Sequence, residues 1–232
     1  MDKAEFDKFA EQYRVMHAAN IAISGETPDF FAEYKVRDVA RLVLQRGMPC
    51  RPSRILDFGA GIGTSVPYFR KYFPEANLTC VDVSTKSLAL GESRFHGDAE
   101  FIAFDGKVLP FDPDTFDIVF AACVFHHIGD DEHVSLLREM MRVLSRGGLA
   151  VIFEHNPLNP LTVHAVNTCS FDENAQLISA VTLKRKFESA GFDGACYRYR
   201  IFFPHFLRML RPLEQVMTWL PLGAQYYVHA IK

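Results

Sequence analysis

The chain has 232 residues, of which 49% are apolar and 23% are charged, a balance typical of one globular domain with a full core. Its formal net charge of −3 argues against general binding to nucleic acid. The five cysteines form no CxxC pair, so neither a zinc ribbon nor a disulfide framework is expected. No signal peptide and no apolar stretch of roughly 20 residues is found, which predicts a cytoplasmic protein.

The first part of the chain is predicted to be helical. Helical spacing of large apolar residues is seen near the start, and the stretch 30–47 has the same periodicity and ends in a glycine. The sequence SGETPD, rich in turn formers, separates the two segments.

Between residues 54 and 155, short apolar runs alternate with helical segments. Strands are predicted over 54–58, 77–83, 99–105, 116–124 and 149–155, and helices over 64–73, 85–95 and 131–144. This alternation predicts an α/β fold with a parallel sheet and helices on both of its faces. Ligands of such sheets bind beyond the carboxyl ends of the strands.

The alternation stops after Glu154. Residues 155–177 form a long segment that is polar in places and holds two prolines, and loops of this length are often functional. A helix is predicted over 182–192 and strands over 194–203 and 224–232.

The segment between these last two strands, 205–223, has an amphipathic helical pattern that Pro212 weakens. Two interpretations are open: its apolar stripe covers the sheet or the mouth of the site, or it contacts lipid with the help of the arginines beside it. The stripe consists of Phe206, Met209, Leu213, Val216, Met217 and Leu220, while Arg208, Arg211 and Gln215 face away.

A glycine-rich turn directly follows the first predicted strand. Gly59, Gly61 and Gly63 leave the backbone without side-chain bulk, so a ligand can approach it closely. Asp82 ends the next strand, where a carboxylate can accept the ribose hydroxyls of an adenosine, and Asp105 ends the third. The turn lacks the G-x-G-x-x-G spacing of a dinucleotide site, which opposes a nicotinamide cofactor.

The motifs ILDFGAGIG, VDVS, FIAFDGKVLPFDPDTFDIVFAACVFHHI and EMMRVLSRGGLAVIFE resemble those of the class I S-adenosylmethionine-dependent methyltransferases, in particular small-molecule members of types 11 and 12. The resemblance covers residues 54–154 and implies a Rossmann-like, seven-stranded, mostly parallel sheet with a reversed C-terminal β-hairpin. It implies that S-adenosylmethionine is bound by Asp57, Gly59, Ala60, Gly61, Gly63, Asp82, Val83, Asp105, Gly106, Ala122 and Cys123.

The resemblance further implies one methyltransferase domain over 1–232. Residues 1–50 would form a helical lid, 51–155 the cofactor-binding core, and 156–232 the substrate side with the last strands. A histidine can take a proton from the methyl acceptor, and His127, then His126, are the candidate bases. No metal ion is required by this chemistry. The candidate contacts to the acceptor are Tyr13, Tyr34, Glu154, His155 and Asn156.

The expected function is methyl transfer to an oxygen, nitrogen or carbon atom of a small organic acceptor, such as a sugar, a secondary metabolite or a lipid-linked intermediate. Two alternatives stay open. One is a nicotinamide-dependent oxidoreductase on a similar sheet, and the other is a non-catalytic adaptor that binds the cofactor or a membrane surface. Weak lipid contact would involve residues 202–222, and the oligomeric state is left open.

Overall fold

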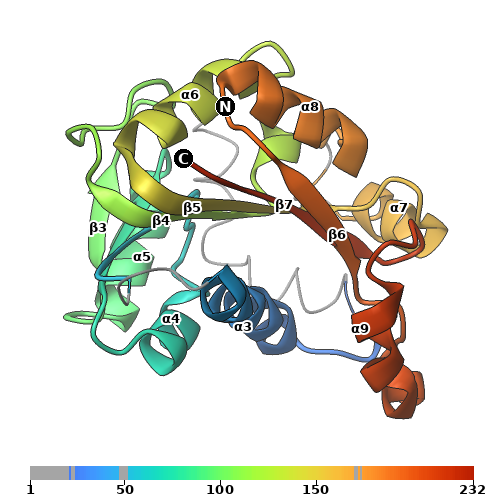
Figure 1. The fold of residues 1–232 in the computed structure, drawn as a ribbon. Helices are drawn as coiled ribbons and strands as arrows, with labels where there is room; N and C mark the ends of the chain where they lie inside the picture. The colour runs from blue at the N-terminus through green and yellow to red at the C-terminus, as the bar shows by residue number, and fades with distance from the viewer. Residues whose placement is uncertain (1–20, 22–23, 47–51, 170–171, 173) are drawn as a thin grey trace.

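The sheet is the centre of the molecule. The computed structural model describes residues 21, 24–46, 52–169, 172 and 174–232. Seven strands lie in the order β3-β2-β1-β4-β5-β7-β6, with β1 to β5 parallel and β7 antiparallel to both of its neighbours (Figure 1). The strands are β1 (Arg54–Phe58), β2 (Asn77–Asp82), β3 (Glu100–Ala103), β4 (Phe116–Ala122), β5 (Leu144–His155), β6 (Cys196–Arg200) and β7 (Gln225–Ile231). The predicted seven-stranded sheet with a reversed last hairpin is confirmed.

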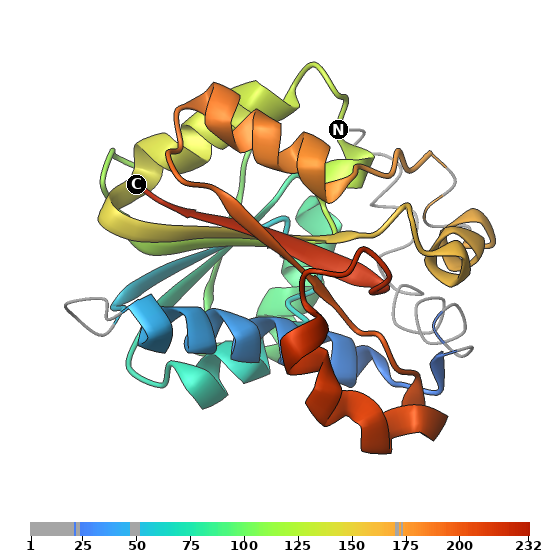
Figure 2. The same ribbon diagram turned by 45° about the vertical axis from the view of Figure 1, so that its right-hand side comes forward.

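Helices cover both faces of the sheet, as predicted. Figure 2 shows α3 and α4 on one face and α6 and α8 on the other. The α-helices are α3 (Pro28–Arg46), α4 (Val66–Tyr72), α5 (Thr85–Arg94), α6 (His133–Val143), α7 (Pro160–Asn167), α8 (Ala180–Ala190) and α9 (Glu214–Met217). Two 3-10 helices, η2 (Phe125–His127) and η4 (His205–Leu213), also belong to the described part.

Each face of the sheet has its own apolar core. Tyr34 of α3 and Phe69 of α4 pack with Phe120 and Phe153 on one face. On the other face, the cores of α6 and α8 join side chains of β1, β4 and β5. Burial of a large apolar side chain contributes about 1.5 to 3 kcal/mol, so both layers hold the central strands in place.

Helix α3 is both a layer of the fold and a wall of the cavity described below. Its core side chains are buried against the sheet, while Phe31 and Lys35 in its first half face the cavity. It is the main part of the predicted lid within the described residues. Tyr13, which together with Tyr34 is predicted to contact the acceptor from this lid, lies outside the described residues.

The long segment after β5 holds a helix that the sequence analysis does not predict. Asn159 caps α7, because its side chain accepts hydrogen bonds from the backbone N–H groups of Leu161 and Thr162. Pro160 occupies the start of the helix, where its missing N–H is tolerated. The two prolines of this segment lead to the expectation of a loop, but in the structure Pro160 is the first residue of a helix.

The amphipathic segment 205–223 does not cover the sheet. Pro212 lies inside η4, and the segment continues as the short α9 instead of one straight helix. Phe206 and Met209 are 79% and 89% exposed. The interpretation that the stripe covers the sheet is therefore wrong, because the segment extends beyond the edge strand β6 (Figure 2). The other form of that interpretation, a place at the mouth of the site, agrees with Phe206, which lines the cavity described below.

Within the part of the chain that the structure describes, no helix combines the length and the apolar character needed to cross a bilayer.

Candidate active site

A cavity of about 420 Å³ opens at the carboxyl ends of β1, β2 and β4. Its size is within the range of small-molecule and cofactor sites. The glycine turn forms one side of it, and the turn is anchored because the N–H groups of Gly59 and Ala60 donate to the carbonyl of Val81 at 2.8 and 3.0 Å. The cavity continues past Cys123 toward α7 and the segment 201–206.

Gly59 and Gly61 are required in the turn for different physical reasons. A Cβ on Gly59 would lie 2.5 Å from a methyl group of Val124, so this position must be glycine for packing. Within the described part of the chain, a Cβ on Gly61 would meet nothing within 4 Å, although the residue has a φ of +54°. Since Gly61 lines the cavity, the bare backbone there gives space to a ligand.

Asp82 holds the turn from the end of β2. Its Oδ2 accepts the N–H of Gly61 at 2.8 Å, and its Oδ1 accepts the N–H of Ser84 at 2.8 Å. A carboxylate oxygen can accept more than one hydrogen bond. Asp82 lines the cavity and can therefore fix the turn and accept ligand hydroxyls at the same time.

Asp57 carries an unsatisfied atom in the cavity wall. The side chain is 2% exposed, and its Oδ2 has no hydrogen-bond partner among the described residues. Burial and the charge of Asp82 raise its pKa to about 7, against the opposing effect of Lys35. A buried acceptor without a donor is costly, so this oxygen fits a ligand that brings a positively charged donor, such as the ammonium group of a methionine moiety.

The remaining candidates for cofactor binding divide into two groups. Ala60, Ala122 and Cys123 line the cavity. Asp105 is exposed, and its Oδ1 accepts the N–H groups of its own turn, from Lys107 and Val108, which lowers its pKa. Gly63, Val83 and Gly106 also lie outside the lining of the cavity.

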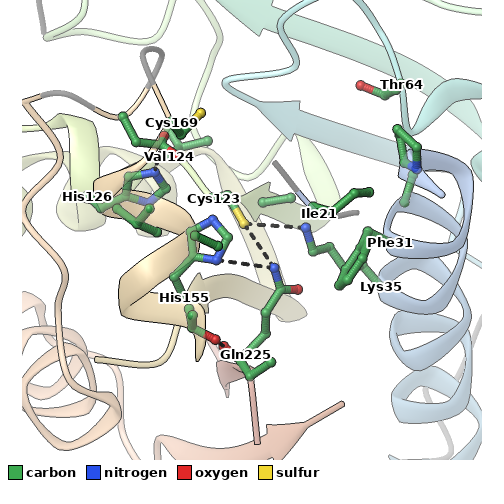
Figure 3. Close-up of a pocket in the computed structure, with 18 of the residues that line it drawn as sticks. Ile21, Phe31, Lys35, Thr64, Cys123, Val124, His126, His155, Cys169 and Gln225 are labelled. Carbon is green, nitrogen blue, oxygen red and sulfur yellow. Dashed lines mark hydrogen bonds and ion pairs between the residues drawn. The ribbon is translucent and has the colours of Figure 1, made fainter. Parts of the chain in front are cut away.

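A polar network crosses the middle of the cavity (Figure 3). The ammonium of Lys35 donates to Sγ of Cys123 at 3.4 Å, and Nε2 of Gln225 lies 3.8 Å from the same sulfur. Nε2 of Gln225 also lies 3.4 Å from Nδ1 of His155. The hydroxyl of Tyr34 donates to Oε1 of Gln225 and thereby orients the amide.

Cys123 has an unusual environment for a half-buried thiol. Burial opposes its ionisation, but the charge of Lys35 and the contact with His155 outweigh burial and lower the pKa to about 7. Its φ of +59° is rare for a residue with a side chain and results from the sharp turn after β4. The thiol is therefore held in the cavity wall in a partly ionised state near neutral pH.

Glu154 fixes the turn that carries both histidines. It is fully buried, and its carboxylate accepts the N–H groups of Val124 and Phe125 at 3.0 and 2.7 Å. Nδ1 of His126 lies 2.6 Å from the other carboxylate oxygen. Glu154 was expected to contact the acceptor, and this expectation is wrong because all of its contacts serve the turn and it does not line the cavity.

His126, His127 and Asp172 meet on the side of the cavity opposite Lys35. Burial opposes protonation of His126, but Glu154 and Asp172 outweigh it and raise the pKa to about 10. Burial is the largest influence on His127 and lowers its pKa. Burial also opposes ionisation of Asp172, yet the two histidines hold its pKa far below the usual value.

The predicted contacts to the acceptor are corrected in two further places. Tyr34 is buried and is used to orient Gln225. Asn156 is buried as well, and its amide donates to the carbonyls of Pro221 and Gly223. Of the predicted acceptor contacts in the described part, His155 alone lines the cavity.

The lining residues that were not predicted as site residues include three with polar side chains that the site uses: Lys35, Asp172 and Gln225. Lys35 lies on α3 among alternating charged and apolar residues, where a charge usually marks the solvent face. Asp172 and Gln225 come from segments far from the glycine motif in sequence. No local pattern connects them to it.

The comparison with known proteins gives a consistent family. Residues 56–152 match the family model of a methyltransferase domain. A demethylmenaquinone methyltransferase of Thermotoga maritima is 32% identical over 66% of this chain and 61% of its own length. A ubiquinone/menaquinone biosynthesis C-methyltransferase of Ectopseudomonas mendocina is 30% identical over 51% of this chain and 48% of its own length. The chain thus spans between about half and three fifths of these two relatives.

Solved structures share the fold. A possible histamine N-methyltransferase of Thermotoga maritima has a TM-score of 0.67 at 16% identity and covers 99% of both chains. A methyltransferase of Archaeoglobus fulgidus that depends on S-adenosylmethionine has a TM-score of 0.63 at 16% identity, over 84% of this chain and 94% of that one.

The environment of Cys123 predicts how its thiol reacts. Alkylation by iodoacetamide requires the thiolate, so its rate should reach half of its maximum near pH 7. In Lys35→Met the lost positive charge should move this midpoint upward. Mass spectrometry of the peptide that contains Cys123, over a series of pH values, measures both. Cys196, on the edge strand β6, serves as the control, and its profile should be the same in both proteins. A midpoint that stays unchanged in Lys35→Met contradicts the assigned contact.

Proposed function

This chain belongs to the class I S-adenosylmethionine-dependent methyltransferases, and on this premise we propose that it methylates an apolar acceptor of the hydroquinone class. The observation that carries the proposal is the single cavity that joins the glycine turn to an apolar chamber with histidines in its wall. The two relatives named above act, by their names, in menaquinone and ubiquinone synthesis, which supports this class of acceptor.

The cofactor half of the cavity is assigned from charge and space. S-adenosylmethionine supplies a methyl group already activated by a sulfonium. The chain binds and aligns it: Asp57 receives the ammonium, the backbone at Gly61 lies against the methionine part, and Asp82 accepts the ribose hydroxyls. Lys35 offers a buried positive charge to the carboxylate of the cofactor's methionine part. Asp105 and Gly106 stay candidates for the adenine end.

The acceptor half is assigned from the remaining walls. Phe31, Leu161, Val166 and Phe202 give it an apolar surface that suits a ring or a prenyl-like chain. His127 lies in the wall beyond Cys123 and is placed to contact a hydroxyl of the acceptor. His126 is engaged by Glu154 through Nδ1, so it orients the turn and comes second as a contact. Alignment of the acceptor with the sulfonium is the main catalytic requirement.

The first of three predictions from the proposed function concerns the cofactor. S-adenosylhomocysteine at about 100 times its dissociation constant should add about 2.7 kcal/mol to the free energy of unfolding, whereas NAD should add nothing. Binding should strengthen as the pH rises from about 6 to about 8, by up to about tenfold, because ionised Asp57 pairs with the ligand ammonium.

Asp57→Asn should weaken binding and remove this pH dependence, since the amide carries no charge. Asp193→Asn, in an exposed loop outside the cavity, is the matched control and should bind as the wild type does. Thermal unfolding with and without ligand measures both. Stabilisation by NAD in place of S-adenosylhomocysteine would contradict the proposed function and would indicate an oxidoreductase.

The second prediction concerns the acceptor. With S-adenosylmethionine, the protein should methylate a reduced short-chain naphthoquinone, and mass spectrometry should detect the product with one added methyl group. His127→Ala should lower kcat by about a hundredfold or more while S-adenosylhomocysteine still binds. His164→Gln, an exposed histidine outside the cavity, should keep the wild-type rate. Full turnover by His127→Ala would exclude a contact between this side chain and the reacting group.

The apolar surface beside the cavity supports a membrane as the source of the acceptor. Phe206 and Leu161 line the cavity and are also 79% and 58% exposed, so the exposed surface is continuous with the entrance. Arg208 lies on the same segment and is exposed. Arg211, expected on the lipid side, pairs with Glu26 at 2.5 Å and stacks on Phe30, so it serves the fold instead. The other strongly exposed apolar side chains of this segment are Met209, Leu213, Val216, Trp219 and Leu222.

The third prediction tests this surface. The protein should float with phosphatidylcholine vesicles, and more strongly when they also contain phosphatidylglycerol, because Arg208 favours anionic headgroups. Replacement of Phe206, Met209 and Trp219 by Ser should reduce flotation at least severalfold without loss of S-adenosylhomocysteine binding. Leu44→Ser, an equally exposed change at the far end of α3, is the control. Equal flotation of both variants contradicts the assignment.

A further inference from the structure

The side chains opposite Lys35 form a second kind of site. We propose that His126, His127 and Asp172 bind one first-row divalent metal ion, of the Zn²⁺ type, on the acceptor side of the cavity. One ring nitrogen of each histidine and one oxygen of Asp172 lie within 4.8 Å of one another. Nothing in the comparisons assigns a metal to this chain, and the sequence analysis expects none.

The distances suit ligands of a common ion better than direct hydrogen bonds. Nε2 of His127 lies 3.4 Å from Oδ1 of Asp172, and Nε2 of His126 lies 3.7 Å from the same oxygen. Hydrogen bonds of this kind are usually about 2.7 to 3.2 Å long. A tetrahedral ion with bonds of about 2.1 Å sets its ligand atoms roughly 3.4 Å apart. The two distances to Asp172 are thus close to the spacing of atoms in one coordination shell, and the ligand atoms of the group all lie within 4.8 Å of one another.

The surroundings orient the ligand atoms in advance. Nδ1 of His126 donates to the buried carboxylate of Glu154 at 2.6 Å, which leaves Nε2 as the free donor of an electron pair on the side of Asp172. A carboxylate behind a ligand histidine is the common supporting contact in metal sites. The segment of Asp172 is fixed to the same turn, because the N–H of Gln176 donates to the carbonyl of His126 at 2.7 Å.

The donor set limits the ion. Two imidazoles and one carboxylate suit Zn²⁺, Fe²⁺ or Co²⁺, whereas Mg²⁺ and Ca²⁺ prefer oxygen ligands. All three side chains line the cavity, so a fourth coordination position faces its interior. Three protein ligands with one open position are typical of catalytic metal sites.

The consequence for methyl transfer rests on the proposed function. A cation here would take a hydroxyl oxygen of the acceptor at its open position and lower the pKa of that hydroxyl. The hydroxyl proton is released to water, and the resulting oxyanion, or the ring carbon conjugated with it, forms a bond to the methyl carbon while the electron pair of the broken carbon–sulfur bond stays on sulfur. After attack through carbon, the ring proton at that carbon is released to water and the hydroxyl is restored. Without a metal ion, His126 is protonated on both ring nitrogens and bridges the carboxylates of Glu154 and Asp172. The experiment below distinguishes this protonated arrangement from the metal-bound one.

The test uses the full chain without a histidine tag, stripped of metal by a chelator. Calorimetric titration with Zn²⁺ should show one equivalent bound with micromolar affinity or better. Titration with Co²⁺ should give the strong visible absorption of a tetrahedral site. Asp172→Asn should weaken Zn²⁺ binding at least about tenfold and remove the Co²⁺ band. His164→Gln, which removes an exposed histidine, should leave both unchanged.

Stabilisation by S-adenosylhomocysteine verifies that each variant is folded. Absence of stoichiometric Zn²⁺ binding overturns the inference, and so does equal affinity of the wild type and Asp172→Asn, because the ion is then held elsewhere. If Zn²⁺ binds as expected but S-adenosylhomocysteine does not, the metal site stands and the proposed function falls. If S-adenosylhomocysteine binds but Zn²⁺ does not, the metal site is excluded and the proposed function stands.

Discussion

The buried carboxylate of Glu154 is the constraint on which both halves of the cavity depend. It lies at the end of β5 and accepts two backbone N–H groups of the turn after β4 and the ring N–H of His126. A charged group with no exposure is stable only when its acceptor capacity is satisfied, and here three donors satisfy it. The same bonds determine where Cys123 and the two histidines stand relative to the glycine turn.

On the cofactor side, the carboxylate of Asp82 fixes a backbone turn in the same way. It ties the glycine turn after β1 to the end of β2, so the turn does not depend on its own weak backbone preferences. Asp57 is different because, among the residues that the structure describes, one of its oxygens has no hydrogen-bond partner. Glu154 is therefore used by the fold alone, Asp82 holds the turn and also faces the cavity, and Asp57 presents an unsatisfied oxygen to a ligand. The hydrogen-bond partners of each carboxylate distinguish these roles better than its position at a strand end does.

Much of the fold could be predicted from the sequence, and so could the place of Asp57, Gly61 and Asp82 in the wall of the cavity, because both are encoded locally. A strand, a turn of glycines and a helix follow one another within residues 54–72, and the acid at the next strand end completes the motif. The acceptor half is assembled from distant segments, and this is where the prediction fails. Glu154 and Asn156 look like pocket residues in a polar stretch, yet buried partners use up their hydrogen bonds. Lys35 and Gln225 reach the cavity only through tertiary packing.

The position of β7 has a consequence for how the chain is made. This strand follows all the other strands in the sequence, yet it lies between β5 and β6 in the sheet and provides Gln225 to the cavity. While the chain emerges from the ribosome, β6 has no neighbour to pair with until residues 225–231 have left the exit tunnel. The ligand chamber is therefore closed only after β7 has emerged, when the nucleotide-side half, built from β1 to β4, has already been able to fold.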